Sequence, residues 1–245
     1  MKIVSVNGVS VVADPGCGIT VRDINVKLRS GEITVLIGPS GGGKTAILNA
    51  IAGVTSLTCG DVSFDFQENI DCLKPEQIMG KPAERDVLVS YQPEMPLLPP
   101  NLTVESYCNR MGIVVPPLLA SNLPEDVIIA DLSASGRRCL WVSLVYSRQA
   151  DLYIYDDPSL GADWKQKRNM AIMFKTQVEN KSVLLATSDP LFAAITADKL
   201  VYVDNGEVLK YFEFDDSTSM NKSIDDFCLS RVETVLSFLD FQMTG

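Results

Sequence analysis

The sequence predicts an α/β protein with a mainly parallel core sheet and helices on both faces of that sheet. The first observation is a set of short apolar runs within 33–37, 151–158 and 181–188, which indicate strands buried on both faces. The second is that segments with the apolar spacing of helices alternate with these runs. The third is an N-terminal portion in which 2–12 and 19–28 alternate polar and apolar residues, a pattern typical of antiparallel strands.

The remaining elements follow from spacing and turn residues. A helix is expected to open at Lys44, directly after the first buried strand, and apolar spacing predicts further helices at 135–149 and 163–179. The Asn-Gly pair at 205–206 lies between two alternating runs and predicts a hairpin. The last apolar segment, 231–241, predicts a short helix that docks on the rest of the chain.

The chain of 245 residues is long enough for one large α/β domain. We expect 1–92 and 132–212 to form its core, and 213–245 to form a C-terminal tail. Between the two core parts, 93–131 changes character and predicts a small inserted subdomain of short helices and irregular structure. The residues that interrupt it are prolines, at positions 93, 96, 99, 100, 116, 117 and 124.

Composition limits the classes of function. The 21 Lys and Arg residues against 31 Asp and Glu residues give a net charge of −10, which argues against a nucleic-acid partner. The N-terminus lacks a secretory apolar region, and no apolar run reaches the ~18 residues that a membrane span needs. We therefore expect a cytoplasmic protein whose role at a membrane, if it has one, depends on a partner.

The chain has no histidine, and its cysteines form no CxxC pair. Both facts argue against a zinc site, because zinc sites in proteins are built from closely spaced cysteine and histidine ligands. Reduced core thiols are the expected state of the six cysteines, which are Cys17, Cys59, Cys72, Cys108, Cys139 and Cys228.

The clearest motif is "GPSGGGKT", which fits the phosphate-loop pattern G-x-x-x-x-G-K-[ST] and lies between a predicted strand and a predicted helix. Its small residues would let consecutive backbone N–H groups surround a phosphate, while Lys44 reaches the β- and γ-phosphates and the Thr45 hydroxyl ligates Mg²⁺. The motif therefore predicts a nucleoside triphosphate site. Its residues are Gly38, Pro39, Ser40, Gly41, Gly42, Gly43, Lys44 and Thr45.

A second motif, "LYIYDDP" at 152–158, is an apolar strand that ends in two carboxylates. Asp156 would lie beside the Mg²⁺ shell, and Asp157 would face the γ-phosphate, where it could polarise an attacking water. A solvated turn before Pro158 is the alternative for such a pair. The phosphate loop upstream favours the catalytic interpretation.

Together these motifs resemble the nucleotide-binding subunit of ATP-binding cassette (ABC) transporters over nearly the whole chain. The stretch from Leu132 to Asp151 fits the family's spacing without a gap. The resemblance implies an ABC cassette of the P-loop NTPase type, with ATP and Mg²⁺ as cofactors. The family's motifs can be followed in order as "GPSGGGKT", "SYQPEMPLLPPNLTVES", "LSASGRR", "LYIYDDP", "SLGAD" and "ATSD".

The resemblance also implies roles for individual residues. Gln92 corresponds to a glutamine that touches Mg²⁺ and the attacking water, and Asp163 to an aspartate that communicates between two sites. Ser133 corresponds to a serine that reaches across a dimer interface to the γ-phosphate of a second cassette. The expected ATP-binding set thus adds Ser133, Ser135 and Gly136, and the expected metal ligands are Thr45, Gln92 and Asp156.

Four features depart from the family's pattern. The family signature LSGGQ is "LSASG" here, at 132–136. Ala134 and Ser135 replace its two glycines, and their side chains leave less room for the backbone to approach a phosphate. Asp157 replaces a catalytic glutamate that is one methylene longer, and Ser188 replaces a histidine that contacts the γ-phosphate. The aromatic residue that stacks on adenine is absent, with Val12 and Ala13 in its place. The residues expected to take part in catalysis are Asp157, Gln92 and Ser188.

Two functions remain open from the sequence. The first is a slow ATPase of a transporter or secretion complex, which closes as a cassette dimer and docks through 93–100 on an integral membrane permease at the cytoplasmic face. The second is an ATP-binding switch that hydrolyses little, or an ABC regulator outside transport. Soluble ABC proteins that act on DNA or ribosomes usually carry a long coiled coil or paired cassettes, and neither pattern is found here.

Overall fold

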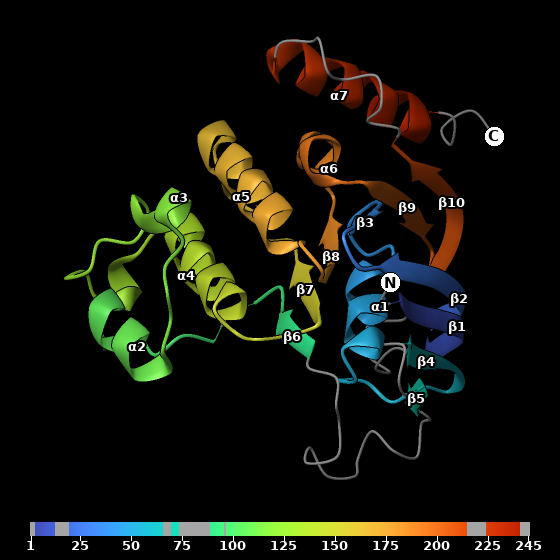
Figure 1. Ribbon diagram of the computed structural model, residues 1–245, viewed down its shortest axis with the longest axis horizontal. Coiled ribbons are helices and arrows are strands. Elements are labelled where there is room, and N and C mark those ends of the chain that lie inside the picture. Colours follow the sequence, from blue (N-terminus) through green and yellow to red (C-terminus); the bar gives the residue numbers. More distant parts are fainter. Residues whose placement is uncertain are drawn as a thin grey trace.

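The computed structural model is organised around a six-stranded sheet in the order β10-β9-β3-β8-β7-β6 (Figure 1). All pairs in it are parallel except β9–β10. Its strands are β3 (Ile33–Ile37), β6 (Val89–Gln92), β7 (Leu152–Asp156), β8 (Ser182–Thr187), β9 (Lys199–Asp204) and β10 (Glu207–Glu213). The structure describes residues 3–12, 20–65, 70–73, 89–95, 97–214 and 224–240.

The parallel arrangement brings the C-terminal ends of several strands to one edge of the sheet. β8 pairs with β3 on one side and β7 on the other, and β6 pairs with β7. The phosphate loop follows β3, the paired acids follow β7, and Ser188 follows β8. Ligands of open α/β sheets bind at this edge, so the topology collects the residues expected at the site.

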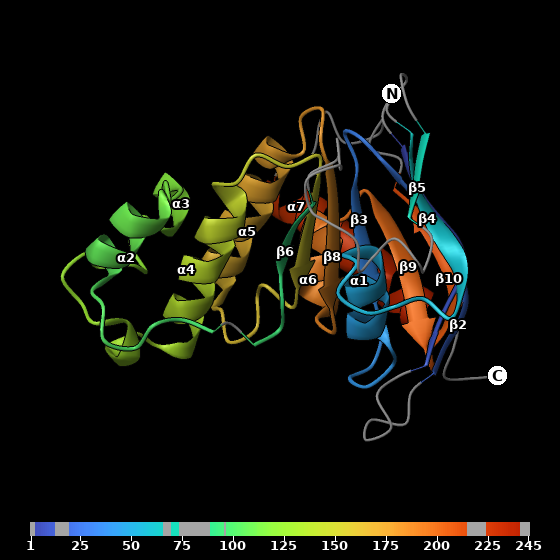
Figure 2. The same cartoon turned by 90° about the horizontal axis from the view of Figure 1, so that it is seen from below.

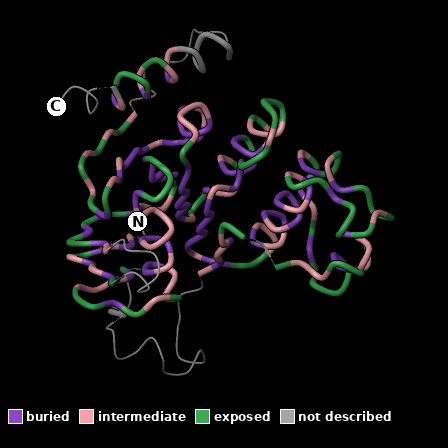
Figure 3. The backbone as a smooth tube through the Cα atoms, turned by 180° about the vertical axis from the view of Figure 1, so that it is seen from behind, coloured by how far each residue is buried: buried purple, intermediate pink, exposed green. Residues whose placement is uncertain are grey.

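The sheet separates two apolar layers, because successive side chains of a strand point to opposite faces. Val35, Tyr153 and Leu185 lie in one buried cluster, whereas their neighbours Leu36 and Ile154 lie in the other. Full burial of such side chains stabilises the fold by roughly 1.5–3 kcal/mol each. Figure 3 shows the resulting concentration of buried residues in the central strands.

The helices divide between the two layers (Figure 2). α1 (Lys44–Ile51) packs on one face together with the N-terminal strands, and its buried side chains share their cluster. The opposite face carries α4 (Ala134–Tyr146), α5 (Trp164–Gln177), α6 (Pro190–Thr196) and α7 (Ile224–Asp240). Helices on both faces of a mainly parallel sheet are the arrangement that the sequence predicts.

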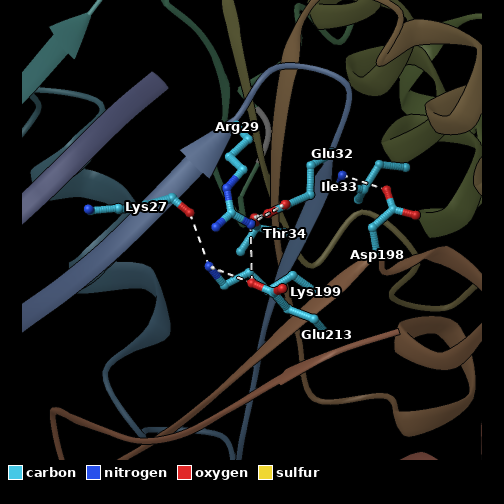
Figure 4. Close-up of polar contacts among 8 residues, drawn as sticks. All are labelled: Lys27, Arg29, Glu32, Ile33, Thr34, Asp198, Lys199 and Glu213. Carbon is cyan, nitrogen blue, oxygen red and sulfur yellow. Dashed lines mark hydrogen bonds and ion pairs between the residues drawn. The ribbon is translucent and has the colours of Figure 1, made fainter. Parts of the chain in front are cut away.

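A second sheet, antiparallel and four-stranded, has the order β2-β1-β4-β5. Its strands are β1 (Ile3–Val12), β2 (Thr20–Arg29), β4 (Cys59–Asp65) and β5 (Ile70–Leu73), and the first two agree with the predicted N-terminal strands. Polar contacts join it to the parallel sheet at the edge opposite the phosphate loop (Figure 4). Arg29 Nη1 lies 3.2 Å from both Glu32 and Glu213, and Lys199 Nζ donates to the Lys27 carbonyl at 3.3 Å.

The proline-rich segment contains α2 (Val104–Met111), α3 (Pro117–Ala120) and a 3₁₀ helix, Ile129–Asp131. Thr103 begins α2 as its N-cap, where its hydroxyl accepts a hydrogen bond from Ser106 N at 3.2 Å. No helix within the described ranges is both long and apolar enough to cross a bilayer.

The C-terminal helix is longer than the short helix predicted at 231–241. α7 begins seven residues earlier, at Ile224, and packs on α6. Arg231 donates to the Ala197 carbonyl and lies over the Phe214 ring, while Val235 and Phe238 are buried. The prediction was too short because the earlier part, which carries two aspartates, lacks a strong apolar pattern.

Three of the cysteines can be compared with the prediction of reduced thiols. Cys59 is exposed, Cys108 and Cys139 are buried, and all three are free. Burial raises the pKa of the Cys139 thiol to about 11, as expected for an unreactive core cysteine. The side chains of Cys17, Cys72 and Cys228 lie outside the described residues.

Candidate functional site

The phosphate loop has a backbone that requires glycine at several positions. Gly41 and Gly43 have φ values of 81° and 102°, in the left-handed region that favours glycine. A Cβ on Gly38 would lie 1.9 Å from the Val203 carbonyl oxygen, which leaves no room for a side chain. Gly206 N donates to the Gly42 carbonyl at 2.9 Å, so the β9–β10 turn supports the loop from behind.

Lys44 begins the helix that follows the loop, and its ammonium group lies over the loop. Its Nζ donates to the carbonyl oxygens of Gly38 and Pro39, each at 2.8 Å. Burial lowers the pKa of Lys44, and this is opposed by the nearby charges of Asp157, Asp156 and Glu94. The lysine is thus already held at the mouth of the loop, within a set of carboxylates.

A pocket of about 880 Å³ opens beside the loop, a size suited to a nucleotide. It brings together eight of the expected site residues: Ser40, Gly41, Gly43, Lys44, Thr45, Asp156, Asp157 and Ser188. The expected residues Gly38, Pro39 and Gly42 belong to the loop but do not line the pocket. The other lining residues are Val11, Val12, Ala46, Asn49, Val54, Thr55, Ser56 and Glu94.

Two buried oxygen atoms at the strand ends have no hydrogen-bond partner among the described residues. Asp156 is only 3% exposed, and its Oδ2 accepts no hydrogen bond from any residue that the structure describes. The same holds for Oε1 of the buried Gln92, whose Nε2 donates to the Asp156 carbonyl at 3.1 Å. Hard oxygen ligands of this kind suit Mg²⁺, and the Thr45 hydroxyl hydrogen-bonds the Asp156 carboxyl. The donor set therefore fits the metal that the motifs predict.

Asp156 carries a perturbed carboxyl. Burial raises its pKa to about 6, and the hydrogen bond from Thr45 counteracts this increase. The carboxylates of Glu94 and Asp157 raise the pKa further, while the Lys44 ammonium lowers it. A bound cation would reverse this balance by favouring the ionised form.

Asp157 is held at both its backbone and its side chain. Its φ of 46° lies in the left-handed region, where residues other than glycine are uncommon. Its N–H donates to the Ala186 carbonyl at 2.9 Å, and its carbonyl accepts from Arg138 Nη1 at 3.0 Å. The Thr187 hydroxyl lies 3.2 Å from its Oδ1. Burial raises the pKa of Asp157, against the lowering effect of this hydrogen bond.

Ser188 is an exposed residue in the pocket wall, directly after β8. The next residue, Asp189, caps α6 by accepting from Leu191 N at 2.9 Å, and it pairs with Lys167 of α5 at 2.6 Å. These contacts anchor the turn on which Ser188 stands. A serine can contact a phosphate through one hydroxyl, but it cannot become a cation.

The expected signature residues do not line this pocket. Ser133 is the N-cap of α4, where its Oγ accepts from Gly136 N at 3.0 Å and lies 3.1 Å from Ser135 Oγ. Asp163 caps α5 in a capping box with Gln166. The structure thus uses these side chains at helix N-termini outside the pocket of the same chain.

Three residues of the site were missed by the sequence analysis. Arg138 is 8% exposed and donates to the carbonyls of Asp156 at 3.3 Å and Asp157 at 3.0 Å. Glu94 adds a third carboxylate to the pocket, and Thr187 contacts the Asp157 side chain. An arginine within the apolar helix of 135–149 was a usable signal, because buried arginines need partners.

No aromatic residue lines the described part of the pocket. Val12 lines the pocket and is largely exposed, and Val54 is exposed to a similar extent. Ala13, the other position where the family pattern predicts an adenine-stacking aromatic residue, lies outside the described residues.

Comparison with known proteins identifies the family. A sequence model described as ABC transporter matches residues 21–160. An sn-glycerol-3-phosphate import ATP-binding protein, UgpC, of Bartonella quintana is 26% identical over 85% of this chain and 61% of its own length. A putative ABC transporter ATP-binding protein of Sulfurisphaera tokodaii is 28% identical over 78% of this chain and 41% of its own length. The chain thus spans about 60% or less of these two relatives.

Solved structures share the fold. An ATP-binding subunit of an ABC transporter superposes with a TM-score of 0.70 at 21% identity, and covers 94% of this chain and 99% of its own. The dimeric cassette MJ0796, in a post-hydrolysis state bound to ADP and Pi, gives 0.69 at 19% identity, with 86% of this chain and 99% of its own covered. The predicted cassette fold is confirmed. Since the family model matches more than half of the sequence, the chain belongs to the ABC transporter family.

Proposed function

We propose that the chain is the ATP-binding subunit of an ABC transporter, and that it binds Mg·ATP and hydrolyses it slowly. One observation carries the proposal. A single pocket is lined by the phosphate loop, by Lys44 and Thr45 at the start of α1, by the acids Asp156 and Asp157, and by Ser188. The names of the relatives, which are ATP-binding proteins of transporters, agree with this function.

The phosphate loop and the strand ends would bind different parts of Mg·ATP. The backbone N–H groups of the loop and the Lys44 ammonium would hold the β- and γ-phosphates. Thr45, Gln92 and Asp156 would hold Mg²⁺ through oxygen atoms, two of which lack partners among the described residues. When bound, this cation neutralises the charge that develops on the phosphate oxygens during transfer.

Asp157 is the group that would orient the attacking water. Its backbone is fixed by Arg138 and Ala186, so the carboxylate starts from a defined position. It is one methylene shorter than the glutamate of the family pattern, and a displacement near 1 Å can cost on the order of 10²-fold in rate. Ser188 can donate one hydrogen bond to the γ-phosphate but supplies no positive charge. Both features favour slow turnover.

A second cassette would complete the site. Ser133 stands at the N-terminus of α4, a helix of 13 residues whose dipole favours an anion there. It does not line the pocket of its own chain, so we propose that it meets the γ-phosphate bound by a partner cassette. The dimeric cassette among the structural relatives is a precedent for such an assembly.

The segment after β6 is the proposed contact with a membrane permease at the cytoplasmic face. Met95 and Leu97 are 81% and 88% exposed, and they follow Gln92 by three and five residues. Large apolar side chains that are exposed next to each other on a protein surface mark interaction sites. Polar replacement of Met95 and Leu97 should abolish co-purification with the permease while leaving the Kd for ATP unchanged; retained co-purification would contradict this assignment.

An ATP-binding switch with little hydrolysis is the second candidate, favoured by the short acid at 157 and by the serine at 188. Such a protein would keep every phosphate-binding contact and would close as a dimer with ATP. It would act beside a more competent cassette or as a regulator outside transport.

One experiment separates the two candidates. Release of phosphate from ATP is measured for the purified chain and for Lys44→Ala, which removes the phosphate-binding lysine. Lys181→Ala is the matched control, because Lys181 pairs with Asp151 beside the opposite end of β8. We expect turnover in the parent and in Lys181→Ala but not in Lys44→Ala. ATP binding without turnover in the parent would support the switch and refute the ATPase.

A further inference from the structure

The last residue of β8, Thr187, is fully buried, yet its hydroxyl reaches the carboxylate of the candidate catalytic acid. We propose that Thr187 is a positioning residue, which fixes the Asp157 carboxylate in the orientation needed to direct the attacking water. The inference rests on the proposed ATPase function and adds a residue to it. Neither the phosphate-loop motif nor the acid pair points to this position.

The sheet register places the two residues side by side. Asp156 at the end of β7 lies opposite Ala186 of β8, so the next residue of each strand is also adjacent. The backbone N–H of Asp157 donates to the Ala186 carbonyl at 2.9 Å, which locks this register at the strand end. The Thr187 Oγ1 then lies 3.2 Å from Asp157 Oδ1.

The direction of the hydrogen bond is determined by a third group. The backbone N–H of Asp189 lies 3.1 Å from Thr187 Oγ1 and can only donate, so the hydroxyl oxygen accepts there. The hydroxyl proton is left for the acceptor on its other side, which is Asp157 Oδ1. The threonine therefore acts as a fixed donor to the carboxylate.

The carboxylate depends on this donor for its orientation. Arg138 and Ala186 hold only the backbone of Asp157, and they leave its side-chain torsions free. In the described parts of the chain, Thr187 is the one residue that donates a hydrogen bond to the carboxylate. Because the aspartate side chain is short, a change in its orientation would move the carboxylate away from the attacking water. A displacement near 1 Å can cost on the order of 10²-fold in rate.

Thr187 also connects the acid to the turn that carries Ser188. Its two hydrogen bonds join Asp157 of one strand end to Asp189 of the next. Asp189 is in turn held by Lys167, so the threonine lies between two anchored groups. This is the arrangement expected of a residue that positions rather than reacts.

The test compares two substitutions at this position with a matched control. Thr187→Val keeps the shape and removes the hydroxyl, whereas Thr187→Ser keeps the hydroxyl. Thr34→Val is the control, because Thr34 is also fully buried, lies in β3 of the same sheet and hydrogen-bonds a carboxylate, that of Glu32, at 3.1 Å (Figure 4). For each purified protein, kcat and KM for ATP, the Kd for ATP and the thermal unfolding midpoint are measured.

We expect Thr187→Val to lower kcat by about tenfold or more and to leave KM and Kd within about twofold. Thr187→Ser should retain most of the parental kcat, and Thr34→Val should keep parental kinetics even if its unfolding midpoint falls. A general loss of packing would reduce activity in both valine variants, and the serine rescue separates the hydroxyl from the fold.

Asp157→Asn makes the failure of the inference distinguishable from the failure of the proposed function. If Asp157→Asn loses turnover while Thr187→Val retains or exceeds the parental kcat, the positioning role is wrong and the acid's role stands. If the parent releases no more phosphate than Lys44→Ala, or if Asp157→Asn retains full turnover, the assigned reaction and the inference are both overturned.

Discussion

Replacing Asp156 with asparagine should stabilise the nucleotide-free protein while impairing its response to Mg·ATP. The carboxyl is 3% exposed, and its Oδ2 finds no partner within the described ranges, so the ionised form is costly to bury. Burial raises its pKa from 3.8 to about 6. At about 1.4 kcal/mol per pKa unit, this costs up to about 3 kcal/mol of stability at pH 8. Because asparagine is neutral, we expect the variant to recover about 1–3 kcal/mol.

The pH dependence follows from the direction of the shift. Between pH 3.8 and about 6 the folded protein holds the proton more tightly than the unfolded chain does, so stability falls as pH rises through this interval. Below this pH interval the carboxyl is protonated in both the folded and the unfolded state, and the cost of burying its ionised form disappears. Above the interval that cost is complete. The gain in the free energy of unfolding from Asp156→Asn at pH 5 should therefore be about half of the gain at pH 8.

The assay is urea unfolding in EDTA at pH 5 and pH 8, followed by the fluorescence of Trp141 and Trp164. Asp126→Asn, a change at an exposed carboxylate, is the control and should alter stability little at either pH. With Mg·ATP added, the parent should gain stability and Asp156→Asn should gain much less. Equal stability of parent and variant at pH 8, or an advantage that does not change with pH, would refute the argument.

Three further substitutions test other parts of the site. Gly38→Ala should abolish ATP binding in equilibrium titrations, because its Cβ would lie 1.9 Å from the Val203 carbonyl oxygen; retained affinity would show that the loop can shift. Ser188→His should raise kcat several-fold over the parent, with Ser188→Ala as control, whereas an unchanged kcat would mean that another group already serves the γ-phosphate. Arg138→Met should lower the free energy of unfolding by about 2 kcal/mol in urea titrations, since two strand-end carbonyls lose their donor; unaltered stability would contradict this.

Local patterns in the sequence were sufficient for the elements that carry the chemistry. The strand at 33–37, the phosphate loop and the helix from Lys44 were predicted because burial period, small residues and helical spacing act over short distances. The hairpin at 205–206 was predicted for the same reason, and the structure shows Asn205 and Gly206 at φ values of 49° and 78°. Such features need no knowledge of distant contacts.

Other features depend on contacts between distant segments. α7 packs on α6, and the need for glycine at position 38 comes from Val203, far along the chain. Arg138 could have been noticed as a buried charge in an apolar helix, but its partners are carbonyls at the end of another element. No local pattern identifies these pairings.

The sequence by itself determined that the chain is an α/β protein with a phosphate loop and a pair of acids at a strand end, because these depend on the order and spacing of residues. Only the tertiary structure decided which of these groups share a pocket, and that Ser133 lies outside it. It also decided that Thr187 holds the Asp157 carboxylate. The reason is physical: strand order and register bring β7 and β8 together, and the resulting contacts join residues thirty positions apart.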